Sequence, residues 1–326
     1  MRVDVQCHVF PKAYADLLLK YGKDFKATRV PDKYLFDFND NQFLAMADAE
    51  YDPASVLAAM DRAKIDLSLI SCTIPDPGLL PAEYSAEAAR LANDEIAELV
   101  CRHPNRFAGI AFLPWNVPDA ALAELEHIAE MGFKSVMLFS HNGGVHADDP
   151  SLLPVYERLE QLGMPVTIHP TIPLWSNSIG AYGLVATASF VIDTGFALMR
   201  LIRSGILEKF PKLNIVMPHA GGVLPYLDGR LTYVPPGARS GPPPINKLTV
   251  PEHLKQGNIW CDLSNPSPEV LSYARSYLTA DKLILGSDYP FVEPDFLVDL
   301  LTSVFPAEEH EKIFWKNANE VYRLGL

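Results

Sequence analysis

The sequence has little cysteine, a deficit of basic residues and no long uncharged hydrophobic run. Its four cysteines, at positions 7, 72, 101 and 261 of 326 residues, match neither a zinc ribbon nor a CxxC redox motif in their spacing. No run of about 18 apolar residues is free of charges or helix breakers, which counts against a transmembrane protein. Residues 1–10 contain no basic region followed by an apolar stretch. We therefore expect no secretory signal, a cytoplasmic location and free thiols.

The charge balance excludes another class of protein. Lys and Arg number 27 against 40 Asp and Glu, for a formal net charge of −13. Nucleic-acid binding needs a basic stripe that meets phosphate, which an acidic chain does not supply. Hydrophobic residues make up 48% and charged residues 21%, the balance of a folded soluble protein rather than a disordered one. We expect neither nucleic acid nor a membrane as a partner.

Short apolar runs rich in β-branched residues alternate with amphipathic stretches along the chain. We predict strands at residues 3–10, 67–72, 107–113, 135–139, 165–169, 213–219, 259–263 and 282–288. Most are almost continuously hydrophobic, as strands buried on both faces are. Helical periodicity lies at residues 53–64, 82–102, 119–131, 150–162 and 267–278. This alternation predicts an α/β fold, a TIM-type (β/α)8 barrel, and no GxGxxG follows the first strand to favour a dinucleotide-binding fold.

Three segments are longer than the strand–helix connections of a minimal barrel. Residues 21–51 are a polar and aromatic insertion, and residues 171–194 and the Pro/Gly-rich residues 233–246 are long loops. Loops at the carboxyl ends of barrel strands cover the active face, so we expect these segments there. Domains usually have about 100–200 residues, but α/β barrels exceed that range. We therefore treat residues 1–326 as a single domain with an insertion at about 21–51.

Side chains of ligand type stand at the ends of several predicted strands. Gln6 and His8 lie on the first strand and share a face, because side chains alternate along a strand. His169 ends the fifth strand, His219 the sixth and Asp288 the eighth. One such residue alone is most often structural, but the carboxyl ends of barrel strands converge. Two imidazoles, a carboxylate and an amide oxygen can hold a divalent cation with open positions, so we predict a catalytic or metal site.

The same residues belong to motifs spread over nearly the whole chain. The motifs are VDVQCHVFP (3–11), FAG (107–109) with LP (113–114), GFK (132–134) with PVY (154–156), IHP (168–170), EKFPKL (208–213), PHAGG (218–222) and LGSDYPF (285–291). In this order they resemble the aminocarboxymuconate semialdehyde decarboxylase-like branch of the amidohydrolase superfamily. EKFPKL and SDYPF are the most specific of them. The resemblance implies a metal-dependent barrel enzyme.

The resemblance also implies roles for the candidate residues. His8, His169 and Asp288 match the family's metal ligands, and His219 matches its catalytic histidine. Gln6 departs from the family's His-x-His or Glu-x-His pattern, because an amide supplies neither imidazole affinity nor negative charge. We keep Gln6 as a predicted ligand of a divalent ion, zinc or manganese. An amide at this position could weaken metal binding, favour a harder ion such as manganese, or leave the site without metal.

The implied reaction is non-oxidative decarboxylation of an aromatic or ring-cleavage carboxylic acid by a carbon–carbon lyase. Asp288 would deliver a proton with His219 stabilising developing charge, or His219 would activate a water. A metal-dependent hydrolase or hydratase acting on a lactone, amide or unsaturated diacid is the alternative on the same scaffold. A catalytically inactive binding protein is a third possibility, supported only by Gln6. The family arginine expected near residues 51–55 is missing, which counts against the semialdehyde substrate.

Four side chains are candidates for binding this small-molecule acid. Arg230 resembles the position from which family dimers send an arginine into the neighbouring site, which implies a homodimer. A surface ion pair with Asp228 is the alternative for Arg230. Trp175, Tyr182 and Phe291 would stack on a planar ring or simply pack.

Overall fold

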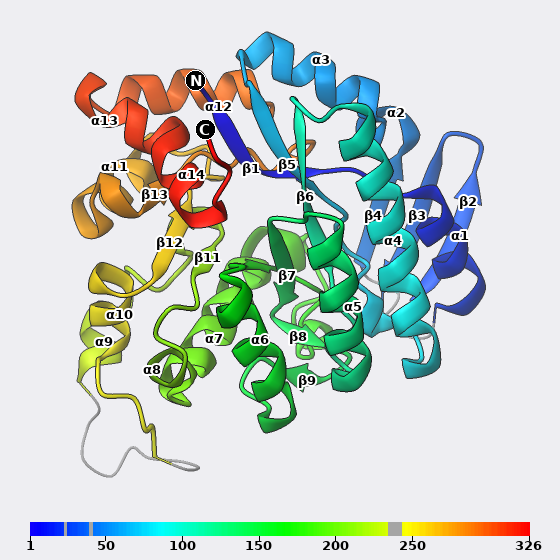
Figure 1. Cartoon of the computed structure of the whole chain (residues 1–326), viewed down its shortest axis with the longest axis horizontal. Helices are drawn as coiled ribbons and strands as arrows, with labels where there is room; N and C mark the ends of the chain where they lie inside the picture. The colour runs from blue at the N-terminus through cyan, green and yellow to red at the C-terminus, as the bar shows by residue number, and fades with distance from the viewer. Residues whose placement is uncertain (23–24, 39–41, 234–242) are drawn as a thin grey trace.

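A closed ring of eight parallel strands organises the protein in the computed structural model, which describes residues 1–22, 25–38, 42–233 and 243–326 (Figure 1). Within these residues the strand order is β1-β5-β6-β7-β10-β11-β12-β13. The strands are β1 (Val3–His8), β5 (Leu67–Ser71), β6 (Phe107–Phe112), β7 (Ser135–Phe139), β10 (Val166–His169), β11 (Ile215–Met217), β12 (Ile259–Asp262) and β13 (Leu283–Ile284). Each predicted strand is present, and the barrel class is confirmed.

Main-chain hydrogen bonds close the ring between its first and last strands. Val5 N donates to Leu285 O at 3.0 Å, and Asp288 N donates to Gln6 O at 2.8 Å. Both Leu285 and Asp288 follow β13, so the segment beyond that short strand completes the barrel. The closure places Asp288 beside the polar residues of β1.

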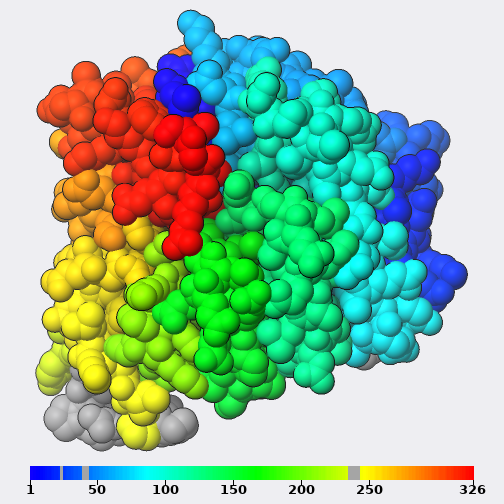
Figure 2. Space-filling view, viewed as in Figure 1, coloured from blue at the N-terminus to red at the C-terminus, as the bar shows by residue number. Residues whose placement is uncertain are grey.

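Helices cover the outside of the ring, and in the space-filling view the side chains of α4, α5 and α6 close over the strands (Figure 2). The helices are α1 (Lys12–Tyr21), α2 (Asp48–Tyr51), α3 (Pro53–Ala63), α4 (Ala82–Arg102), α5 (Pro118–Glu130), α6 (Leu153–Leu162), α7 (Phe190–Arg203), α8 (Ile206–Lys209), α9 (Asp228–Thr232), α10 (Val250–Gln256), α11 (Pro268–Leu278), α12 (Pro294–Val304), α13 (Ala307–Glu311) and α14 (Asn317–Tyr322). In α4 the buried Ala88, Ala92, Ile96 and Leu99 recur every three or four residues. This spacing forms one apolar stripe, which meets the barrel.

The insertion predicted at about residues 21–51 carries a small sheet beside α1 and α4 (Figure 1). Strands β2 (Lys26–Val30), β3 (Lys33–Phe38) and β4 (Gln42–Ala47) pair antiparallel. Residues 23–24 and 39–41 of the insertion lie outside the described residues. The same holds for residues 234–242 of the predicted loop 233–246. A short hairpin of β8 (His141–Asn142) and β9 (Val145–His146) follows β7.

The long segment after β10 leads into the most apolar helix. A π-helical turn, Val185–Ser189, continues directly into α7. Among the described residues, Val185–Arg203 alone has the length and composition to cross a membrane, and half of its apolar stretch is buried inside the structure. That burial is typical of a helix packed on a barrel, and the start of this segment faces the cavity described below.

Candidate active site

Three predicted ligand residues converge at the carboxyl end of the barrel. The donor atoms of His8, His169 and Asp288 all lie within 4.8 Å of one another. His8 ends β1, His169 ends β10, and Asp288 follows β13. Residues far apart along the chain meet because all strands of a parallel barrel point their carboxyl ends to one rim.

Hydrogen bonds orient the two imidazoles. His169 Nδ1 lies 2.8 Å from Pro170 O. Since a carbonyl only accepts, Nδ1 carries the proton and Nε2 keeps a free lone pair. His8 Nδ1 lies 3.0 Å from Ser71 Oγ. Burial lowers the pKa of His169 to about 3, so this ring is neutral and available as a metal ligand at neutral pH.

Three side-chain nitrogen atoms surround the Asp288 carboxylate. Its Oδ1 accepts from Gln6 Nε2 at 2.9 Å and lies 3.0 Å from His8 Nε2, while its Oδ2 lies 3.7 Å from His219 Nε2. Burial alone would raise the pKa of Asp288, but the contacts with His219 and His8 hold it well below its usual range. Burial alone would lower the pKa of His219, but the neighbouring Asp288 raises it. The site thus pairs an ionised carboxylate with an imidazole that holds its proton more firmly.

His219 and Asp288 lie beyond the strands that were predicted to end with them. They follow β11 and β13 in turns, with φ values of 59° and 63°. Left-handed backbone is uncommon for residues with a Cβ, and at functional sites the surrounding structure holds it in place. His219 N donates to Asp262 Oδ1 at 3.1 Å. The corresponding amide of Asp288 is held by the main chain of β1.

Two buried acids that support the site were not predicted. Asp262 accepts hydrogen bonds from His219 N and from the backbone and hydroxyl of Ser264. Asp4 accepts from Ser287 N at 2.8 Å and from Ser287 Oγ at 2.6 Å. Burial raises the pKa of Asp262 and of Asp4 to about 6 each. The strand-end position of Asp262 was a usable signal, whereas Asp4 lies inside a hydrophobic strand and had none.

A cavity of about 330 Å³ opens over the clustered residues. Its polar lining includes His169, His219 and Asp288. Its wall is otherwise largely apolar, with Phe38, Leu44, Ile74, Ile172, Phe190 and Phe291. Among the described residues that line it there is no lysine or arginine. The cavity has the size and lining typical of a small-molecule site.

The predicted aromatic residues lie in different places. Phe291 lines the cavity, and its ring centre lies 6.3 Å from that of His8. Trp175 does not line this cavity, and its indole N–H instead donates to Asp193 at 3.1 Å. Tyr182 is 96% exposed and also lies outside the lining. Of the three predicted aromatic residues, Phe291 alone is therefore placed to stack on a bound ring.

Arg230 lies on α9, exposed and outside the cavity lining of its own chain. The alternative, a surface ion pair between Arg230 and Asp228, is not among the contacts of the described residues. The Asp228 carboxylate bonds instead to Lys255 at 3.2 Å and to the Tyr277 hydroxyl at 2.7 Å. The predicted contact of Arg230 with a neighbouring site stays a prediction.

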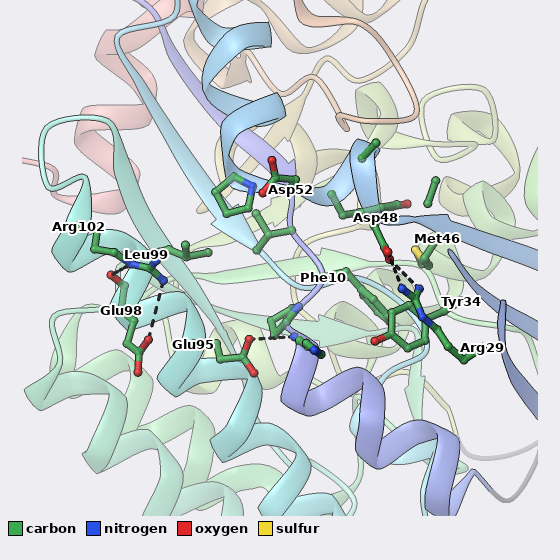
Figure 3. A pocket seen from close by; sticks show the side chains of 17 residues that line it. Phe10, Arg29, Tyr34, Met46, Asp48, Asp52, Glu95, Glu98, Leu99 and Arg102 are labelled. Atoms are coloured by element: carbon green, nitrogen blue, oxygen red, sulfur yellow. Dashed lines mark hydrogen bonds and ion pairs between the residues drawn. The ribbon is translucent and has the colours of Figure 1, made fainter. Parts of the chain in front are cut away.

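A second cavity, of about 670 Å³, lies between α4 and the insertion (Figure 3). Arg29 and Asp48 pair across two hydrogen bonds on one side. On the other side Glu95 accepts from the backbone N–H groups of Lys12 and Ala13. Because these charged groups already have partners, we place the chemistry at the smaller cavity over the barrel.

The chain is similar to known proteins over almost its whole length. A family described as Amidohydrolase matches residues 3–324. The 2-amino-3-carboxymuconate-6-semialdehyde decarboxylase of Dictyostelium discoideum is 27% identical over 342 residues, covering 100% of this chain and 92% of the relative. The gamma-resorcylate decarboxylase of Rhizobium radiobacter is 30% identical over 281 residues, covering 82% and 86%. The dihydroxybenzoic acid decarboxylase from Polaromonas sp. JS666, with bound manganese and the inhibitor 2-nitroresorcinol, has a TM-score of 0.83 and 24% identity over 100% and 97% of the two chains.

Proposed function

Since the chain belongs to the amidohydrolase family, as the motifs predicted, we propose that it is a metal-dependent, non-oxidative decarboxylase of an aromatic carboxylic acid. One observation carries this proposal. His8, His169 and Asp288 cluster beside His219 under a largely apolar cavity at the barrel mouth. The enzyme class is a carbon–carbon lyase.

The clustered donors fit a divalent cation. Two imidazole nitrogens and one carboxylate oxygen within 4.8 Å of one another are a donor set that zinc and manganese both accept. His8, His169 and Asp288 would hold the ion, and the related Polaromonas enzyme holds manganese. When bound, the ion supplies positive charge that holds the oxygen atoms of an acid.

Decarboxylation needs a proton on the ring carbon that bears the carboxylate. The ring carbon–carboxylate bond then breaks, its electron pair returns to the ring, and carbon dioxide leaves. Contacts with His219 and His8 hold the pKa of Asp288 low, Asp288 in turn raises the pKa of His219, and His219 Nε2 lies 3.7 Å from Asp288 Oδ2. The proton passes from His219 Nε2 to Asp288 Oδ2 and from there to the ring carbon, and water reprotonates His219.

The cavity favours an aromatic acid over a ring-cleavage diacid. Phe38, Phe190 and Phe291 line the cavity, and aromatic side chains there favour a planar ring. A second carboxylate would lie in an apolar wall in which the described lining offers no cationic side chain, and burying it there is costly. The missing arginine near residues 51–55 points the same way.

We also propose a homodimer in the cytoplasm. Tyr226 and Tyr233, on either side of α9, are 86% and 66% exposed, and a second copy would cover them. Arg230 lies on α9 between these two tyrosines and would then contact the neighbouring copy. The free thiols of Cys7, Cys72, Cys101 and Cys261 suit a reducing compartment. Light scattering on the purified protein measures its mass in solution, and a monomer would contradict the proposed homodimer.

Carbon dioxide release tests the proposed activity. Purified protein loaded with manganese or zinc is incubated with a panel of hydroxybenzoates, and metal-free protein is the control. We expect carbon dioxide and the matching phenol from at least one acid, with the loaded protein only. Proton release without carbon dioxide, from a lactone or amide, would overturn the proposal in favour of a hydrolase.

A further inference from the structure

Gln6 is the site residue that departs from the family pattern, and the structure specifies how its amide is used. Nε2 donates to Asp288 Oδ1 at 2.9 Å, and Oε1 lies 3.1 Å from Ser264 Oγ. The side chain is buried, with 3% exposed. Both ends of the amide are therefore engaged by protein groups.

The contact with Asp288 selects this orientation of the amide. A carboxylate oxygen accepts hydrogen bonds, so the group that faces it must be a donor. If the amide were turned over, Oε1 of Gln6 would face Asp288 Oδ1, and two electron-rich oxygens would lie in contact. In the observed orientation the oxygen of Gln6 points to Ser264 instead.

Gln6 holds Asp288 at a second point, through the main chain. Its carbonyl oxygen accepts from Asp288 N at 2.8 Å. The Asp288 turn is thereby tied to β1 by backbone, and the carboxylate is tied to β1 by the amide. A change of the Gln6 side chain would remove the hydrogen bond between the amide and the carboxylate, and it would leave the main-chain hydrogen bond in place.

We propose that Gln6 is a positioning residue, which holds the Asp288 carboxylate by its amide N–H, and that the metal is bound by His8, His169 and Asp288 without it. This replaces the ligand role predicted for Gln6 and rests on the proposed metal-dependent function. A carboxylate oxygen has two lone pairs, so Asp288 can accept from Gln6 and also bind an ion. Three protein donors leave more of the ion open to the cavity, which suits an acid that binds through a carboxylate and an adjacent hydroxyl.

Cobalt(II) tests the ligand set, because its visible absorption depends on the atoms bound to it. Wild type is compared with Gln6→Met, which keeps the length of the side chain and removes both polar atoms. We expect the same band positions and intensities, and by calorimetry a loss of cobalt affinity of about tenfold. His169→Ala is the comparator, with a changed spectrum and a loss above about a hundredfold.

The catalytic rate separates positioning from a merely structural role. At saturating metal, Gln6→Met should lower kcat for carbon dioxide release about tenfold with little change in KM. A Gln6→Met spectrum that changes as that of His169→Ala does, or an unchanged kcat at saturating metal, would overturn the proposal. Gln6→Ala serves in the same comparison if the Met variant does not fold. If wild type releases carbon dioxide from no acid, the proposed function fails, and the cobalt comparison still decides the ligand set.

Discussion

His219 Nε2 lies 3.7 Å from Asp288 Oδ2, and both residues have left-handed backbone in turns that follow barrel strands. The contact raises the pKa of His219 and lowers that of Asp288. Main-chain hydrogen bonds hold both turns, one to Asp262 and the other to the first strand. Changes to the two side chains should therefore alter chemistry more than folding.

Asp288→Asn should lower kcat for carbon dioxide release by about a thousandfold, because an amide neither takes up nor delivers the proton. The same change weakens the hold on the ion, so the assay is run at saturating manganese. Carbon dioxide release gives the rate, and circular dichroism confirms that the variant folds. A rate within about tenfold of wild type would exclude Asp288 from proton transfer.

His219→Asn should lower kcat by about a hundredfold and leave the metal content unchanged. His219 is not one of the three clustered donors, whereas His8 is. His8→Ala is the matched control, and it should lose metal as well as activity. Elemental analysis alongside the kinetics distinguishes the two, and loss of metal from the His219 variant would contradict its assignment.

Removal of the ion should abolish activity. Dialysis against a chelator is expected to stop carbon dioxide release, and added manganese or zinc should restore it, because the ion would supply the positive charge that holds the acid. Metal content is measured in the same samples. Full activity in protein verified to be free of metal would contradict the proposed mechanism.

Phe291→Ala should raise KM for an aromatic acid about tenfold, because the ring lines the cavity and an aromatic contact is worth about 0.5–1.5 kcal/mol beyond its buried area. Trp175→Phe is the control. The Trp175 indole bonds to Asp193 and lies outside the cavity lining, so KM should stay unchanged. Steady-state kinetics on one hydroxybenzoate gives both values, and the reverse pattern would restore Trp175 as the stacking residue.

The free energy of unfolding of the metal-free protein should fall at low pH, because the buried His169 is kept neutral in the folded state. Its pKa is lowered from an ordinary 6.5 to about 3, so the unfolded chain takes up the proton first. The stabilisation is complete above pH 6.5 and is lost as the pH falls toward 3, by about 5 kcal/mol at most at 1.4 kcal/mol per pKa unit.

Urea unfolding of wild type and His169→Asn measures this contribution, because titrations of other groups cancel in the difference between them. The advantage of wild type at pH 7 should shrink by pH 4. A difference that stays constant over that range would mean that the imidazole is not kept neutral in the folded state.

The barrel strands could be predicted because burial on both faces leaves a continuous apolar run. Residues 135–139 show this, since the predicted strand coincides with β7. The three-stranded sheet of the insertion was not predicted. Its strands mix exposed charged residues such as Lys26 and Arg29 with buried aromatics such as Phe36, and they pair only with one another.

The distinction between a chemical residue and a packed one could not be predicted in the same way. Phe291 and Trp175 were both predicted, as loop aromatics, to stack on a bound ring or simply to pack. Of the two, only Phe291 lines the cavity. Gln6 was predicted as a metal ligand from its position in a motif. The direction of its amide depends on Asp288 and Ser264, which lie far along the chain. Such choices depend on contacts that no local pattern contains.

By itself the sequence determined the alternation of strands and helices, the family, and the residue types at the strand ends, because periodicity and motif order are properties of the chain. Tertiary structure alone decided the distances among His8, His169 and Asp288, the left-handed turns, and which atom of Gln6 meets which oxygen. The physical reason is that barrel closure brings the first and last strands together, and hydrogen bonds and pKa values then depend on through-space neighbours.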